Sequence, residues 1–120
     1  MDAPALPPDE VGPQLEGKAK AIGDLDSLVQ ALLTALPASK PWQRQLRMHL
    51  ADVDRVSQVL RLVVAMGRSE QEVNQAAGEL LAAMRAAKAS VNGGRADMGT
   101  KAAASLGFNL AQKVVASLSK

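Results

Sequence analysis

One serine in the sequence has neighbours that could prepare it to carry a prosthetic group. Asp26, Ser27 and Leu28 form a tripeptide that, in the right setting, takes a phosphopantetheine arm on the serine hydroxyl. That chemistry needs an exposed serine at the start of a helix with acidic residues. The next five residues are apolar apart from one glutamine, and Gly23 stands one position too far upstream. We therefore expect Ser27 either to restart a helix with Gln30, in capping-box spacing, or to lie on the outer face of one long helix.

The single histidine suggests a second kind of chemistry. His49 and Asp52, three residues apart on a predicted helix, could supply two metal ligands, and an exposed helical histidine could also accept a phosphoryl group. No further ligand stands nearby in the sequence, and the residues after His49 lack the lysine and glycine that keep a phosphate-accepting histidine open. We expect a histidine at the boundary of the core.

Other catalytic patterns are missing from the sequence. It has no cysteine, no glycine-rich phosphate loop and no Ser-His-Asp order. Asp52 and Asp54 fall on different faces of one predicted helix, and Glu70 and Glu72 fall in a first turn, where they favour the helix dipole. We predict no catalytic residue, no cofactor and no metal site, and therefore not an enzyme.

The composition indicates a helical protein of one domain. Hydrophobic residues make up 48% of the 120 residues but aromatic residues only 2%, so Leu, Val, Met and Ala must build the core. Four of the six prolines fall within residues 1–13, which we predict to be a disordered tail. The remainder, 14–120, is predicted to be an all-α, antiparallel, up-down-up-down four-helix bundle with helices at 14–36, 40–66, 70–91 and 97–119.

The helix boundaries follow from local signals. We predict caps by Ser39, Ser69 and Asp97 at the starts of the last three helices, with a capping box from Ser69 to Glu72, and closure of the second helix by Gly67. Apolar spacing then predicts the buried positions. They are Leu15, Ala19, Ile22, Leu25, Val29, Leu32 and Leu36; Leu46, Leu50, Val53, Val56, Leu60 and Val63 or Val64; Val73, Ala77, Leu80, Met84, Ala87 and Val91; and Leu106, Leu110, Val114 and Leu118.

Charge is unevenly distributed along the chain. Residues 1–39 carry two basic against six acidic residues, a net −4, whereas residues 40–68 carry six basic against two acidic residues, a net +4. We interpret this as neighbouring helices that complement each other. In its alanine content, its few aromatics and its Leu-Pro-Ala-Ser turn at 36–39, the chain resembles focal-adhesion-targeting and talin-rod bundles. The resemblance includes no diagnostic motif, so it transfers no binding residue.

The helix predicted at 40–66 has more apolar residues than one buried stripe requires. An additional flank lies beside an arginine-bearing side, and two neighbouring helices could cover both flanks. The alternative is a groove for a protein partner, a helix or acidic segment, or for self-association. The candidate partner-binding residues are Arg44, Arg47, Met48, Arg55, Val59, Leu62 and Met66.

The last predicted helix suggests a different function. After Asp97 it has no acidic residue, and its polar and apolar residues separate as in a helix at a membrane surface, a pattern that bundle helices share. The candidate residues for binding anionic lipid are Arg95, Lys101, Lys113 and Lys120.

The expected function is that of a non-enzymatic protein-interaction or adaptor module, with membrane-surface targeting as the alternative. Nucleic acid is not an expected partner, because basic and acidic residues nearly balance and no aromatic platform is present. Without a Sec-type leader or an apolar run of bilayer length, we expect a cytoplasmic protein. The proline-rich start and the helix predicted near Lys120 are compatible with a domain of a larger protein.

Overall fold

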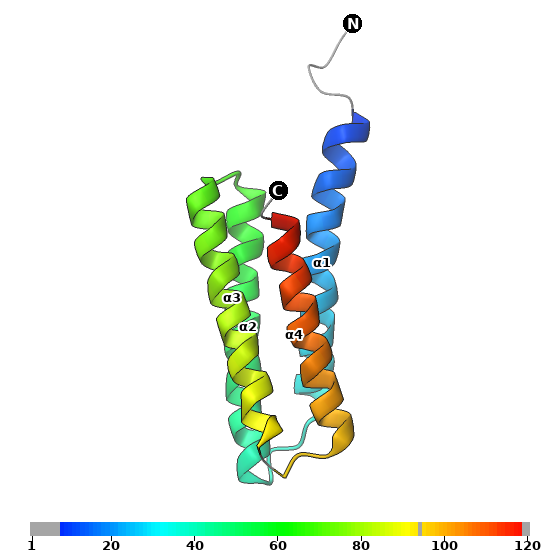
Figure 1. Ribbon diagram of the computed structural model, residues 1–120, viewed down its shortest axis with the longest axis vertical. Coiled ribbons are helices and arrows are strands. Elements are labelled where there is room, and N and C mark those ends of the chain that lie inside the picture. Colours follow the sequence, from blue (N-terminus) through cyan, green and yellow to red (C-terminus); the bar gives the residue numbers. More distant parts are fainter. Residues whose placement is uncertain (1–7, 94, 119–120) are drawn as a thin grey trace, which may run out of the picture.

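The computed structural model describes residues 8–93 and 95–118, and their side chains from residue 17 onward. This part of the chain contains four α-helices and no strand: α1 (Pro8–Ala35), α2 (Pro41–Ala65), α3 (Glu70–Asn92) and α4 (Met98–Leu118). Each helix packs against two others, α1 against α2 and α4, and α3 against α2 and α4. Figure 1 shows the four helices side by side, with the start of α1 reaching beyond its neighbours. The prediction of an all-helical fold with four helices is confirmed.

The first helix begins earlier than the sequence predicted. α1 starts at Pro8, so residues 8–13 are helical rather than part of a tail. Pro8 is tolerated because the first N–H of a helix has no intrahelical acceptor in any case. Pro13 removes one bond of the ladder, which reduces the stability of this turn without ending the helix. The rest of the predicted tail, residues 1–7, lies outside the described residues.

The start of α2 differs from the prediction in its capping residue. The cap position is Lys40, not Ser39, and a lysine side chain has no acceptor for the first N–H groups. Gln43, in the first turn of the helix, provides the acceptor instead. Its Oε1 accepts from Ser39 N at 3.1 Å, Ser39 Oγ at 3.1 Å and Lys40 N at 2.9 Å. Gln43 is buried, so this polar side chain is part of the fold.

The other predicted helix ends are present. Gly67 has a φ of 64°, and the N–H groups of Gly67 and Arg68 donate to Val64 and Val63, the two bonds of a Schellman ending. The Ser69 hydroxyl accepts from Glu72 N at 3.2 Å and caps α3. At α4, Asp97 Oδ2 accepts from Thr100 N at 3.0 Å, and Asp97 Oδ1 accepts from Thr100 Oγ1 at 2.7 Å.

The predicted core is largely confirmed. On α2 the five positions from Leu46 to Leu60 are buried as expected, and on α3 five of the six predicted positions are buried while Val73 is partly exposed. α1 contributes Ile22, Leu25 and Val29, but Ala19 is exposed, and nothing is described of the Leu15 side chain. The core is therefore aliphatic.

The buried face of α4 was partly mispredicted. Leu106 is 51% exposed, and the buried residues are Ala104, Gly107, Ala111, Val114 and Leu118. Their spacing of three and four residues defines a face of small side chains, whereas the prediction followed the larger ones. A Cβ on Gly107 would lie 2.9 Å from Met84 Cε and 3.5 Å from Leu28 Cδ2, so α3 and α4 approach closely at this point.

Trp42 packs against the core at the start of α2. Its side chain is partly exposed, but the indole Nε1 is buried and has no hydrogen-bond partner among the described residues. A buried donor without a partner costs stability relative to a bonded one. The packing of the ring must offset that cost.

Candidate functional site

The outer face of α2 carries large apolar side chains that the bundle does not cover. Met48 is 74% exposed, Val59 45%, Leu62 59% and Met66 59%. Only two other large hydrophobic side chains of the described residues, Met98 and Leu106 on α4, are comparably exposed. The possibility that two neighbouring helices cover both flanks of α2 is therefore wrong, because α1 and α3 leave this face open.

These side chains lie on one line along the helix. At about 100° per residue, positions separated by three or four residues recur on the same side. Ala51 and Arg55 occupy the remaining positions of the line, and both are exposed. We call this surface the outer ridge; it consists of Met48, Ala51, Arg55, Val59, Leu62 and Met66.

A shallow groove lies on each side of the outer ridge. The groove toward α1 is lined by Leu33, Ala38, Arg44, Arg47, Met48 and Ala51. Toward α3, two hollows are lined partly by small residues, which keep the surface low beside the ridge. One contains Ala82, Ala83 and Ala86 with Asp52, Arg55 and Glu79, and the other contains Val59, Val63, Ala76, Glu72 and Glu79. The outer ridge therefore stands between two depressions.

Two of the predicted partner-binding arginines already have a structural role. Arg47 Nη1 donates to Leu33 O at 2.6 Å and to Leu36 O at 2.8 Å. Arg44 Nη1 donates to the carbonyls of Ala38 and Ser39, each at 3.1 Å. The last carbonyls of a helix have no intrahelical donor, and a cation near them also offsets the helix dipole. Arg47 thus caps the C-terminal end of α1, a role that the sequence did not reveal.

Arg55 is the charged centre of the outer ridge. Its Nη2 lies 2.7 Å from Asp52 Oδ1, one turn earlier on α2, with side chains 64% and 50% exposed. An exposed pair of this kind contributes at most about 1 kcal/mol. Arg55 and Asp52 can therefore exchange partners at little cost when another surface approaches.

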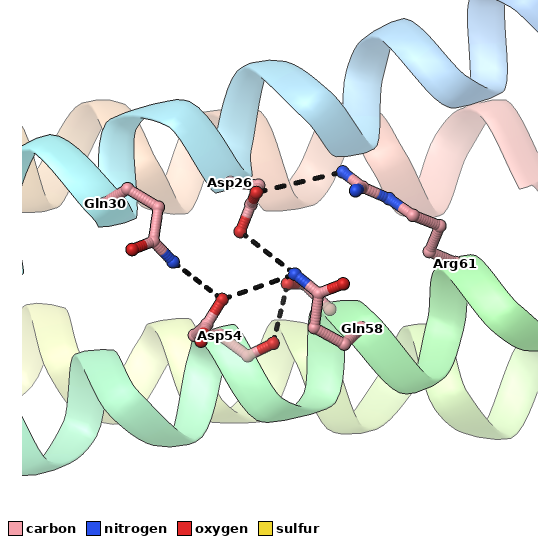
Figure 2. A network of polar contacts seen from close by, with 6 residues as sticks. Asp26, Gln30, Asp54, Gln58 and Arg61 are labelled. Atoms are coloured by element: carbon pink, nitrogen blue, oxygen red, sulfur yellow. Dashed lines mark hydrogen bonds and ion pairs between the residues drawn. The ribbon is translucent and has the colours of Figure 1, made fainter.

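A polar network joins α1 to α2 beside the outer ridge (Figure 2). Gln30 Nε2 donates to Asp54 Oδ1 at 2.8 Å, and Gln58 Nε2 lies 3.4 Å from both Asp26 Oδ1 and Asp54 Oδ1. Arg61 lies 3.9 Å from Asp26 Oδ2. Within this network, only the contact between Asp26 and Arg61 pairs an acidic residue of α1 with a basic residue of α2. Together these contacts hold the two helices in one register.

The candidate lipid-binding residues are spread along α4 and the loop before it. Arg95 and Lys113 are exposed, Lys101 is partly buried, and Lys120 lies outside the described residues. Most of the apolar face of α4 is buried in the bundle. Phe108 lies beneath two cations of α3, with Lys88 Nζ 4.8 Å and Arg85 Cζ 5.8 Å from the ring centroid. That face is therefore unavailable to a membrane while the bundle is closed. None of the described helices contains an apolar stretch of the length that a bilayer span requires.

Ser27 and His49, the two residues with possible chemistry, lie on different helices and in different surroundings. Ser27 is exposed in the middle of α1, so it lies on the outer face of one long helix and does not restart one. The helix start that a phosphopantetheine serine needs is not formed there. His49 is partly buried in the groove with Asp52 and Glu79. Among the described residues, no group of three or more His, Cys, Asp or Glu could hold a metal ion.

The capping of α1 by Arg47 joins residues 11 and 14 positions apart, which sequence spacing could not have connected. Gln43 lies three and four residues after the groups that it bonds, so capping-box spacing was a signal that could have found it. No protein-family model, curated protein or solved structure matches this chain. The candidate site is therefore defined by its own geometry.

Proposed function

We propose that this chain is a non-enzymatic, cytoplasmic interaction module, an up-down-up-down bundle that binds a protein partner through the outer ridge of α2. The observation that carries the proposal is the exposure of Met48, Val59, Leu62 and Met66 on one line of a helix whose opposite face is fully packed. Exposed apolar side chains gathered on one face mark interaction surfaces more often than scattered ones do.

The chemistry of the outer ridge suits an amphipathic helix. Fully burying a Val, Leu or Met side chain that starts exposed contributes about 1.5–3 kcal/mol, and covering a half-exposed one contributes a corresponding fraction. Four such side chains can offset much of the roughly 4–15 kcal/mol that association costs in lost freedom. The Arg55 guanidinium, at the centre of the apolar line, adds a site for a carboxylate of the partner.

Site-specific photo-crosslinking tests this proposal. A photoreactive benzophenone amino acid replaces Leu62, and the same amino acid replaces Ala116, which is exposed on α4, as the control. In cells that produce the protein, we expect adducts from position 62 that are absent from position 116. If positions 59, 62 and 66 all give no more adduct than position 116, the outer ridge is not the interaction surface.

Binding to a membrane surface is the alternative function. Leu106 and Lys113 are both exposed on α4 and, seven residues apart, share a face of the helix. Each cation near an anionic surface contributes about 1 kcal/mol. Sedimentation with phosphatidylserine vesicles at low salt should then capture the protein, and Lys101→Glu with Lys113→Glu should abolish capture. If the protein stays in the supernatant, the membrane alternative is rejected and protein binding is the remaining proposal.

A further inference from the structure

The outer ridge has the same spacing in both directions along α2. With exposed Arg44 added at one end, the separations are four, three and four residues up to Arg55, and again four, three and four residues beyond it. The positions are 44, 48, 51, 55, 59, 62 and 66. Reversing the direction of the helix about Arg55 therefore places every member of the line onto another member.

This symmetric spacing about Arg55 allows the outer ridge to pair with a second copy of itself across a two-fold axis. In a closed dimer with two-fold symmetry, residue i of one copy contacts residue j of the other, and j contacts i. If the axis passes Arg55, Met48 faces Leu62 of the other copy and Ala51 faces Val59. On either side of the axis, these layers pair Ala51 with the larger Val59 and Leu62 with the more flexible Met48, which favours interdigitation.

We propose that the partner of the outer ridge is a second copy of this chain, bound with its α2 antiparallel and with Arg55 beside the two-fold axis. The inference rests on the proposed function, since it names the partner of that same surface.

The ridge is also straight enough for such pairing. Positions 44, 55 and 66 are 11 residues apart, and an 11-residue repeat drifts only slightly around an α-helix. The line from position 44 to position 66 is about 33 Å long at 1.5 Å per residue. Two copies can therefore remain in contact over almost the whole length of α2.

Charge complementarity selects the antiparallel direction. The start of α2 carries Lys40, Arg44 and Arg47 with no acidic residue before Asp52. Beyond the other end, the exposed Glu70 and Glu72 begin α3 beside Arg68, whose Nε lies 3.1 Å from Glu72 Oε2, so residues 68–72 carry a net charge of −1. Antiparallel pairing brings each basic end beside the acidic turn of the other copy, whereas parallel pairing would place the two basic ends together. Opposite helix dipoles add to the same preference.

The centre of the interface is self-complementary in charge. Each copy brings one Asp52–Arg55 pair, 2.7 Å apart, to the axis. Two such pairs related by a two-fold axis form four alternating charges, in which each guanidinium can contact a carboxylate of its own chain and one of the other chain. The two arginines therefore do not meet without compensation.

The first experiment measures association of the purified chain by analytical ultracentrifugation, from about 1 µM to about 1 mM. We expect a reversible monomer–dimer equilibrium. Arg55→Asp places four acidic groups at the axis and Asp52→Arg places four basic ones there, so each variant alone should have its dissociation constant raised at least about tenfold. An equimolar mixture of the two variants should recover the dimer.

Controls keep this result specific. Met98→Asp removes an apolar side chain on α4 that is even more exposed, at 86%, and should leave the equilibrium unchanged. Far-UV circular dichroism checks that each variant is folded, which is expected because Asp52 and Arg55 are exposed. A wild-type chain that stays monomeric throughout overturns the inference, as does a mixture that associates no better than its components.

The second experiment determines the direction of pairing. The chain contains no cysteine, so single cysteines introduced into it can pair only between copies. In the antiparallel dimer, Met48→Cys mixed with Leu62→Cys should form a disulfide, because those Cβ atoms face each other. Met48→Cys alone should not, since its two copies lie about 21 Å apart along the helices. Efficient linking of Met48→Cys to itself would indicate parallel pairing and overturn the proposal.

Failure of this inference differs from failure of the proposed function. If the chain is monomeric but position 62 crosslinks to a different protein, the outer ridge binds a partner that is not a second copy. If the adduct from position 62 has the mass of two chains, both proposals are supported. If neither dimer nor adduct forms, both are wrong.

Discussion

α2 has apolar side chains on two opposite faces. On the inner face Leu60 is fully buried, whereas on the outer face Leu62, two residues along, is 59% exposed. The inner face is covered because α1 and α3 pack against it on either side of the core. In an arrangement where each helix contacts only two neighbours, the side turned away from both must face solvent or another molecule.

This difference separates residues that stabilise the bundle from residues available for binding. Both faces show helical spacing, so periodicity alone cannot distinguish them. What distinguishes them is the number of neighbouring helices, which is a property of the whole fold. Substitutions along α2 should therefore fall into two groups, and the following predictions test the separation, from the largest effect to the smallest.

The largest effect is expected on the inner face. Leu60→Ala removes a fully buried side chain and leaves a cavity, so the free energy of unfolding should fall by about 2–5 kcal/mol. Leu80→Ala, equally buried on α3, should cost about the same. Urea denaturation followed by circular dichroism measures both. A loss well below this range for Leu60 would show that the inner face is looser than its burial indicates.

The next largest effect concerns Arg47, which lies on the side of α2 that faces α1 and bonds the end of that helix. Arg47→Met keeps much of the apolar stem but removes the donors to Leu33 and Leu36, and it should cost roughly 1.5–3 kcal/mol. Arg55→Met is the matched control on the outer ridge. Because its ion pair with Asp52 is exposed, it should cost no more than about 1 kcal/mol. Equal losses would place Arg55 in the fold and contradict the separation.

A smaller effect is expected from the network that joins α1 to α2. Asp54→Ala removes the acceptor of Gln30 and of Gln58, and the loss should be about 0.5–1.5 kcal/mol. In a double-mutant cycle with Gln30→Ala, the double variant should lose less stability than the sum of the two single losses. Additive losses would mean that the 2.8 Å contact contributes nothing to stability.

On the outer ridge the expected change in monomer stability is close to zero. Leu62→Ala, at protein concentrations below any association, should change the free energy of unfolding by less than about 0.5 kcal/mol. The contrast between Leu60 and Leu62 is the sharpest test of the two faces. A large loss at position 62 would show that the outer ridge stabilises the single chain.

The last prediction lies outside α2 and concerns the dependence of stability on pH. Hydrogen bonds from the Thr100 hydroxyl and backbone hold the pKa of Asp97 below its usual value. The folded state then binds this proton less readily than the unfolded state. The contribution of Asp97 is therefore present above the unfolded pKa and is lost as pH falls through the folded one.

Asp97→Asn keeps an acceptor but does not titrate. Its melting temperature should fall less steeply below about pH 4 than that of the wild type. Parallel slopes would show that the cap does not contribute to acid sensitivity. The difference in free energy of unfolding between Leu60→Ala and Leu62→Ala should be the same below about pH 4 as at neutral pH, since neither side chain titrates.

Much of the fold could be predicted because its signals are local. Gly67 and Asp97 lie at helix ends whose chemistry depends on residues three to five positions away, and both predictions are confirmed. The spacing from Leu46 to Leu60 identified a buried face in the same way. Short-range geometry of this kind follows from the helical period alone.

Some errors and omissions arose where distant segments meet, whereas the cap of α2 by Gln43 was missed within local spacing. The Leu33 carbonyl that Arg47 contacts is 14 residues away, so neither sequence position indicates the other. Leu106 was expected in the core because of its four-residue spacing from Leu110 and Val114, but the close approach of α3 to α4 buries Gly107 instead. The candidate residues of the outer ridge were identified from the excess of apolar positions. Only the packed structure shows that α1 and α3 leave these residues exposed.

Trp42 gives the protein a spectroscopic reporter at one end of the bundle. It is the only tryptophan and the chain has no tyrosine, so near-ultraviolet emission arises almost entirely from this ring. An indole whose N–H is shielded from water emits at shorter wavelength than a solvated one, and unfolding should therefore shift the emission to the red. Circular dichroism, in contrast, reports all four helices. Coincident transitions by the two methods would show that the start of α2 opens only when the whole bundle does.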